Sequence, residues 1–355
     1  MDLGHLQQVI DHAVSPSSPQ RLQATAVLDS LRGASDRWML GLKCFFESPS
    51  DTTKLFGLSL IRDYLSNQAT GGGGGMDASE LVARRTVRES MLRWASAQVL
   101  SGSQIPPFIL NSVVTILTLG IKFEYPTHWP SAFDELLPLA RPESGPYGID
   151  LVVRILSDLE LEVVMFTEKR TEDEKRNNTL IKDTMRAGPV IPAVVSLLCA
   201  STVSMFNAGC VELAERCLRC LAELIGWIDL NLVIAEALPT LYRALTIEPL
   251  TGAACNCLYE MLKKGMDSVT KVRMVHAIGL LPALQALPLV AALQPAAAGA
   301  AAAAGAAAAA GAAGAAGLAF GGSGGGSNGH AGNNFSGGFG FGATNSNNNN
   351  NNNNY

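Results

Sequence analysis

Apolar residues recur at intervals of three and four positions along most of the chain. This spacing places apolar side chains on one face of an α-helix, whereas a half-buried strand requires a period of two. Proline, glycine, serine or aspartate separates the periodic segments, as is typical of helix ends. The pattern therefore predicts an all-α fold. Helices are expected at 18–32, 36–47, 52–68, 77–101, 106–121, 129–139, 147–166, 172–186, 190–206, 209–226, 230–246, 249–264 and 268–288.

The segment 77–101 has the clearest amphipathic pattern. Its apolar line consists of Ala83, Val87, Met91 and Trp94. The opposite side carries Arg84, Arg85, Arg88, Glu89 and Arg93. Such a face is either a solvated helix surface or a contact surface, because guanidinium groups form forked bonds to phosphates and carboxylates.

The expected helix pairs return about every 40 residues, a period typical of HEAT-like repeats. In such a solenoid, antiparallel pairs stack and bury a continuous core between neighbours. Three expected helices are preceded by a candidate N-cap residue, namely Asp36, Asp51 and Asp267. The inner surface of the solenoid is normally formed by the second helix of each pair, and it suits a macromolecule better than a small substrate.

Composition divides the chain into two parts. The last charged residue is Arg273, and from Pro295 onward the sequence consists of alanine runs broken by glycine, then glycine, serine and asparagine. Such a segment has too little apolar surface to offset the entropy of ordering. We expect a HEAT-repeat solenoid over 1–289 and a disordered tail over 290–355. Glycines interrupt the Ala296–Ala316 run, so a transmembrane helix is not expected there.

Charge and cysteine content narrow the possible environments. The net charge of −5 argues against a surface built throughout for polyanions, although a local basic face remains possible. The seven cysteines and the lack of an apolar export segment indicate a reducing compartment and free thiols. Two cysteine pairs, Cys217 with Cys220 and Cys255 with Cys257, lie inside expected helices, so we interpret them as small core residues rather than zinc ligands.

Catalytic chemistry is not indicated by the sequence. The five histidines are not spaced for a metal, and no nucleophile motif surrounds them. We therefore expect no enzyme activity, no metal site and no cofactor.

Two segments interrupt the helical pairing. Gly71–Gly75 is a flexible insert between two helices, where a loop lengthens at little cost in free energy. The strongly charged stretch Glu168–Arg176 precedes another helical segment, and we expect it to lie across the inner side of the solenoid.

The segment Lys175–Arg186, which reads Lys-Arg-Asn-Asn-Thr-Leu-Ile-Lys-Asp-Thr-Met-Arg, closely resembles a segment of the exportin-T family. Trp227–Leu230, Ala254–Leu258 and Lys264–Asp267 are similar to later segments of that family, in the same order and at comparable spacing. The turn containing Glu124-Tyr125-Pro126 and Trp129-Pro130 resembles a turn of the wider importin-β superfamily.

The resemblance covers most of positions 20 to about 289 and corresponds to the N-terminal third or so of an exportin-T. It implies a monomeric nuclear export receptor for tRNA that binds the GTP form of Ran and passes nuclear pore proteins, shuttling between nucleus and cytoplasm without membrane insertion. The family's N-terminal repeats receive Ran, and GTP hydrolysis belongs to Ran. A generic α-solenoid scaffold for protein partners is the alternative.

The sequence departs from the family pattern at the Gly71–Gly75 insert and after about residue 289, where the tail replaces further repeats. The chain is therefore expected to be a fragment, an imperfect gene model or a linker cut off before further repeats. The sequence leaves these three alternatives open.

Candidate Ran contacts are polar residues in what the pattern predicts to be the second helices of the first repeats. They are Arg37, Lys43, Arg84, Arg85, Arg88, Asp134 and Glu135.

The helix over 172–186 is the candidate for contact with cargo or Ran. We expect Arg176, Lys182 and Arg186 to face the partner. The neighbouring apolar line, formed by Leu180, Ile181 and Met185, is expected to anchor the segment to the solenoid. A capping helix whose charges meet only water and Asp183 is the other interpretation.

Overall fold

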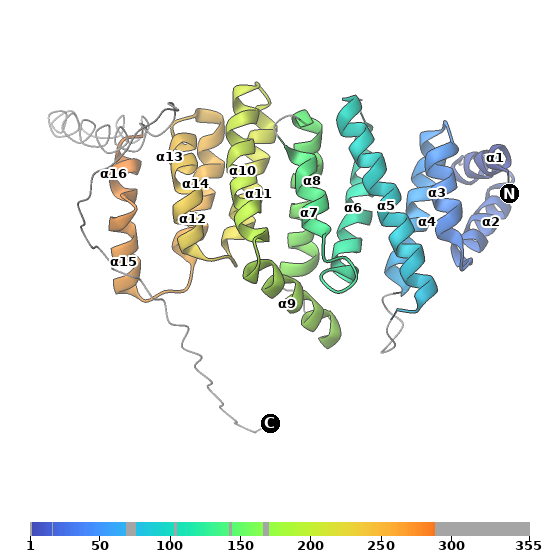
Figure 1. The fold of residues 1–355 in the computed structure, drawn as a ribbon. Helices are drawn as coiled ribbons and strands as arrows, with labels where there is room; N and C mark the ends of the chain where they lie inside the picture. The colour runs from blue at the N-terminus through green and yellow to red at the C-terminus, as the bar shows by residue number, and fades with distance from the viewer. Residues whose placement is uncertain are drawn as a thin grey trace, which may run out of the picture. The chain divides into compact units, whose positions relative to one another are not determined.

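The computed structural model describes residues 2–15, 17–68, 76–102, 105–141, 144–165 and 170–287. All regular elements within these ranges are helices, which confirms the predicted fold class (Figure 1). The Gly71–Gly75 insert and the predicted tail over 290–355 lie outside the described residues.

The helices of the first half are α1 (Leu3–Val14), α2 (Arg21–Gly33), α3 (Arg37–Glu47), α4 (Asp51–Gln68), α5 (Ala78–Ser101), α6 (Pro107–Glu124), α7 (Ala132–Leu136), the 3₁₀ turn η1 (Leu137–Ala140), α8 (Gly145–Leu159) and the π turn η3 (Glu160–Val164). Those of the second half are α9 (Glu172–Ala187), α10 (Val190–Asn207), α11 (Val211–Ile225), α12 (Leu230–Glu236), α13 (Leu238–Leu245), α14 (Glu248–Lys263), α15 (Ser268–Ala277) and α16 (Leu280–Gln285).

Consecutive helices pack as pairs, and the pairs stack side by side. The pairs are α1 with α2, α3 with α4, α5 with α6, α7 and η1 with α8, α10 with α11, and α13 with α14. The second helices contact one another in the order α4, α6, α8, α11 and α14 (Figure 1). We call this the second-helix row. One apolar cluster runs from Phe45 on α3 to Leu280 on α16, so the core is continuous through neighbouring pairs.

The helix α1 was not predicted, and it changes the pairing. Leu6, Val9 and Ile10 are buried against α2 and α4 in a second, smaller cluster. Their spacing of three and four is the helical signal, but it extends over only one short segment. Because α1 pairs with α2, the helices α3, α5 and α7 are first helices of their pairs. The prediction that they are second helices is therefore wrong.

Two predicted helices are each divided into two α-helices in the structure. The segment 230–246 forms α12 and α13, which meet at Ala237 with a proline in the first turn of α13. Proline lacks the N–H that a continuous helix requires. The segment 268–288 forms α15 and α16, separated by Gly279 in the left-handed region at φ +66°. A backbone turn of this kind favours glycine.

The predicted N-caps have different outcomes. The carboxylate of Asp267 accepts a hydrogen bond from the Thr270 amide at 2.9 Å, which confirms the cap of α15. Asp36 makes no such side-chain bond at the start of α3, and Asp51 is itself the first residue of α4.

The helices α6 and α10 are long and apolar enough to cross a membrane by length and composition alone. In the structure, 56% and 44% of these segments is buried inside the fold. Both act as core helices, packed against the neighbouring pairs.

Glycine allows the close contact between α3 and α4. A Cβ atom added at Gly57 would lie 2.6 Å from both the Gly41 carbonyl oxygen and the Cys44 Cβ atom. Neither atom belongs to the far end of a flexible side chain, so the two helices would have to move apart. Gly252 on α14 is a natural comparison because a Cβ atom there meets nothing within 4 Å.

We predict that Gly57→Ala lowers the free energy of unfolding by about 1–3 kcal/mol, the usual cost of overpacking a tight contact. The control Gly252→Ala should be neutral or stabilising by up to about 1 kcal/mol, since alanine is the better helix former. Urea unfolding monitored by circular dichroism measures both. Equal effects of the two substitutions would contradict the proposed close contact.

Candidate partner-binding surface

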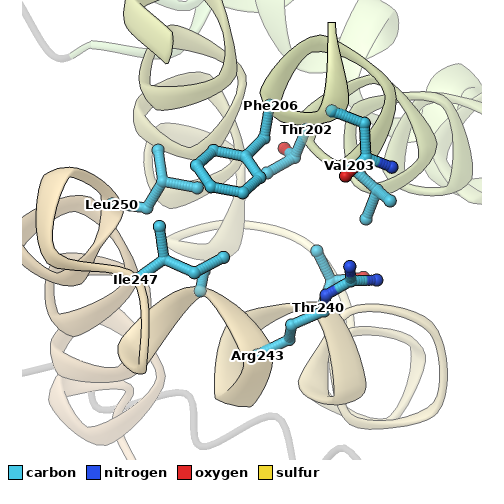
Figure 2. A pocket seen from close by; sticks show the side chains of 9 residues that line it. Thr202, Val203, Phe206, Thr240, Arg243, Ile247 and Leu250 are labelled. Carbon is cyan, nitrogen blue, oxygen red and sulfur yellow. The ribbon is translucent and has the colours of Figure 1, made fainter. Parts of the chain in front are cut away.

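The crevice between α10 and α13 shows how tightly the helix pairs are packed (Figure 2). Its lining consists of Thr202, Val203, Phe206, Asn207, Thr240, Arg243, Ala244, Ile247 and Leu250. It has room for little more than one water molecule. A small-molecule site normally needs several hundred Å³. The crevice is therefore too small for a metabolite, and the exposed helix faces are the better candidates for binding.

Arg84 is buried and does not belong to a solvated face. Its side chain is fully covered, forms an ion pair with Glu80 at 2.9 Å and donates to the Leu65 carbonyl oxygen at 3.1 Å. The guanidinium also lies 5.6 Å from the ring centroid of Phe123. These contacts join α5 to α4 and α6. The prediction that Arg84 faces a partner is wrong, because neighbouring helices cover the side chain.

Arg88 has a similar structural role one turn further along α5. It forms an ion pair with Glu124 of α6, and its guanidinium lies 4.9 Å from the ring centroid of Trp129. Burial raises the pKa of Glu124, although the charges of Arg88 and Arg84 act in the opposite direction. Only 12% of the Arg88 side chain is exposed, so it has little surface for a partner.

Arg37 is the third predicted contact that the structure buries. Its guanidinium donates to the carbonyl oxygens of Ala34 and Asp63 at 3.0 and 3.3 Å. It also lies 5.6 Å from the ring centroid of Tyr64. Arg37 therefore holds α3 against α4 and is not available to Ran.

The remaining predicted Ran contacts are exposed, but they lie on first helices. They are Lys43 on α3, Arg85 on α5, and Asp134 and Glu135 on α7. Arg85 is paired with Glu89 at 2.7 Å, and Glu135 accepts a hydrogen bond from the Trp129 indole at 3.2 Å. The reason for selecting these residues, their position on second helices, is not met.

An exposed charged group on second helices was missed by the sequence reasoning. Arg32 on α2 pairs with Asp29 at 3.2 Å and approaches Asp63 on α4 at 4.0 Å. Arg62 pairs with Asp63 at 3.5 Å and is about half exposed. We call these four residues the α2–α4 charged group. Helical periodicity gave no signal of this contact, because the contact depends on how Arg32, near the C-terminal end of α2, approaches α4.

The helix α9 lies outside the simple pairing and contacts η3, α6 and α10 (Figure 1). It starts with a capping box in which the Thr171 hydroxyl and the Glu174 carboxylate each accept from the other's backbone N–H. The pattern Thr-x-x-Glu was visible in the sequence. Ile181 and Met185 are buried as predicted, but Leu180 is 47% exposed and does not anchor the helix.

The basic residues of α9 are compensated by acids on the same helix. Arg176 pairs with Asp173 at 3.3 Å, and Arg186 pairs with Asp183 at 3.1 Å. Arg176 is 80% exposed, whereas Lys182 is half-buried. A phosphate would have to compete with these carboxylates. The surface of α9 therefore suits a protein partner of mixed charge at least as well as a nucleic acid.

Three of the four paired cysteines are core residues, as the sequence predicted, and the prediction is wrong for Cys255. Cys217 and Cys220 are buried on α11, and the Cys257 thiol lies 3.2 Å from the Leu218 carbonyl oxygen. Cys255, in contrast, is exposed on the other side of α14. The four sulfur atoms of the two pairs therefore do not share one environment. Burial raises the pKa of the Cys217 thiol to about 12, so it stays protonated.

We predict that Arg84→Ala lowers the free energy of unfolding by about 3 kcal/mol, because it removes one partner of a buried ion pair. The exposed Arg85→Ala on the same helix serves as the control and should change stability little. Chemical denaturation of both variants provides the measurement. Similar losses in the two would contradict the structural role of Arg84.

Comparisons with known proteins agree with the geometry. Residues 106–258 match the family described as exportin 1-like protein. Exportin-T of Danio rerio is 30% identical over 261 residues, which cover 73% of this chain and 26% of that protein. Exportin-T of Homo sapiens is 30% identical over 263 residues, which cover 73% of this chain and 26% of that protein. Exportin-T of Arabidopsis thaliana is 29% identical over 204 residues, which cover 54% of this chain and 20% of that protein. The chain spans about a quarter of the length of the first two relatives. With its stacked helix pairs, the chain is therefore similar to exportin-T over nearly three quarters of its length and contains an exportin 1-like region.

Proposed function

We propose that this chain is the Ran- and cargo-binding part of a nuclear export receptor for tRNA that acts with the GTP form of Ran. The proposal rests on the similarity to exportin-T over nearly three quarters of the chain, which folds into stacked helix pairs. A receptor of this kind shuttles between nucleus and cytoplasm and meets nuclear pore proteins. It binds its partners without catalysing a reaction.

The α2–α4 charged group is the surface on which we place the Ran contact. Arg32 and Arg62 are about half exposed, and Arg62 lies on α4 in the second-helix row, the kind of helix that normally forms the inner surface of a HEAT solenoid. Their ion pairs with Asp29 and Asp63 are exposed, so a partner carboxylate can replace them at little cost. The first-helix residues Lys43, Arg85, Asp134 and Glu135 form the alternative contact surface.

We predict that reversing both charges, in Arg32→Glu with Arg62→Glu, weakens binding of Ran-GTP by about tenfold or more, since it removes charge-assisted bonds. Lys43→Glu with Arg85→Glu should have the smaller effect. Arg219→Glu on α11 is the matched control, because this exposed arginine also has a helical acid partner, Glu215. Biolayer interferometry with the full chain gives the three dissociation constants.

The second part of this experiment compares binding of the GTP and GDP forms of Ran. The full chain should retain the GTP form and release the GDP form. Equal retention of both would contradict the Ran assignment and favour a generic scaffold. A larger loss with the Lys43 and Arg85 pair would place the contact on the first helices instead.

The helix α9 is the proposed cargo contact, through Arg176, Lys182 and Arg186. We predict that replacing all three with alanine lowers the salt dependence of tRNA binding, by about 0.7–0.9 in the logarithmic slope for each lost phosphate contact. Asp173→Asn with Asp183→Asn should strengthen binding, because these carboxylates compete with phosphate. Fluorescence anisotropy across a salt series provides the slopes. An unchanged slope together with a lower melting temperature would make α9 a structural element only.

A further inference from the structure

The loop between α11 and α12 joins three parts of the chain through Trp227 and Ile228. The indole Nε1 of Trp227 donates to the Glu160 carboxylate at 2.8 Å. Arg186 of α9 donates to the Trp227 carbonyl oxygen at 3.0 Å, and its guanidinium lies 5.3 Å from the ring centroid. Lys264, at the end of α14, donates to the Ile228 carbonyl oxygen. Trp227 therefore lies between the end of α8 and the last turn of α9.

The backbone that carries Glu160 is irregular. The helix α8 ends at Leu159 and continues as the π turn η3, and such turns occur often at functional positions. Arg170, just before α9, donates to the carbonyl oxygens of Leu161, Glu162 and Val163 at 2.9–3.2 Å. The N-terminal end of α9 is thus fixed by Arg170, and its C-terminal end by the contact with Trp227.

Glu160 is half-buried at this junction. Burial raises its pKa to about 7, and the negative charge of Glu223 acts in the same direction. The hydrogen bond from Trp227 and the charge of Lys182 lower it by less. The ionised carboxylate is therefore poorly accommodated where the structure places it.

Several other titratable or charged groups surround this junction. They are Glu223 and Cys220 on α11, Lys182 and Arg186 on α9, Lys122 on α6, and Asp158 and Glu162 on the same helix and turn as Glu160. Lys122 is paired with Glu162 at 2.7 Å, and α10 carries no charged residue. Among these groups, Glu160 is the one that accepts the Trp227 hydrogen bond.

We propose that Glu160 and Trp227 form a proton-controlled latch that positions the C-terminal half of α9 on the neighbouring helices. A protonated Glu160 is neutral, accepts the indole hydrogen bond and tolerates burial. An ionised Glu160 gains by moving toward water and away from Glu223, which breaks the bond to Trp227. Arg186 then loses the ring and the carbonyl oxygen against which it lies. The latch consists only of residues of this chain, so it does not depend on which partner α9 binds.

The direction of the pH effect follows from the raised pKa of Glu160. Glu160 has a higher pKa in the closed junction than its ordinary value of 4.5. The closed form therefore binds the proton more tightly than the open form, and its extra stability is complete below pH 4.5. This stability declines as the pH rises toward about 7 and is lost above that value. Raising the pH from 5 to 8 should release the latch.

The latch can be tested by fluorine NMR on the full chain labelled with 5-fluorotryptophan. The chain has four tryptophans, so the Trp227 signal can be assigned by its loss in Trp227→Phe. If that variant does not fold, the same signal is assigned by elimination with Trp38→Phe, Trp94→Phe and Trp129→Phe. We expect the Trp227 signal to titrate with a midpoint near 7 between pH 5 and 8.5.

Two matched variants identify the titrating group. Glu160→Gln keeps the size of the side chain and mimics its neutral form, so its Trp227 signal should stay at the low-pH position throughout. Glu223→Gln removes only the neighbouring negative charge and should keep the titration, with a midpoint at lower pH. A titration that survives in Glu160→Gln, or no titration in the wild type, would overturn the proposal.

Hydrogen exchange tests whether the latch positions α9. After correction for the intrinsic pH dependence of exchange, the amides of 181–187 should exchange several-fold faster at pH 8 than at pH 5 in the wild type. In Glu160→Gln the corrected rates should be equal at the two pH values. A titrating Trp227 signal without any change in these rates would show that α9 is held by other contacts, and would also overturn the proposal.

Discussion

Each helix pair in the described part of the chain buries its apolar side by packing against neighbouring pairs. No single pair encloses a core, because two helices leave most of their apolar stripes open. The continuous cluster from α3 to α16 results from this dependence. Small residues make the contacts possible at the closest points, as Gly57 does between α3 and α4. Stability and the position of any binding surface therefore both depend on how the pairs stack.

Buried arginines support the stacking at the N-terminal pairs. Arg37, Arg84 and Arg88 each reach from their own helix to a carbonyl oxygen, carboxylate or aromatic ring of a neighbour. Arginine suits this role because its stem packs as an apolar chain while its planar head offers several donors. Each guanidinium thereby holds its own helix against a neighbouring one. These residues are consequently unavailable to a partner, whereas the arginines of the α2–α4 charged group remain at the surface.

The helix α9 has a different relation to the stack. Its apolar side is short, and polar contacts at both ends hold it: Arg170 at η3 and Arg186 at Trp227. Polar contacts of this kind depend on charge and protonation, whereas apolar burial does not. Although Ile181 and Met185 anchor α9 in the continuous cluster, this difference is the reason that our proposal assigns a response to protonation to its C-terminal half.

The sequence by itself determined the all-α class, the repeat class and most of the helices, because apolar spacing within one segment is local information, but it missed α1. It identified Ile181 and Met185 as anchors of α9 and, of three predicted caps, was right for Asp267. It did not determine which polar side chains are covered. Arg84 and Arg85 are adjacent in the sequence and both lie on the charged side of α5, yet α4 and α6 cover only the first. Likewise, Glu160 and Trp227 are 67 positions apart, and only the stacking of α11 beside α8 brings them together. Tertiary structure decides such contacts because burial depends on neighbouring helices that can be distant in the chain, as α8 and α11 are.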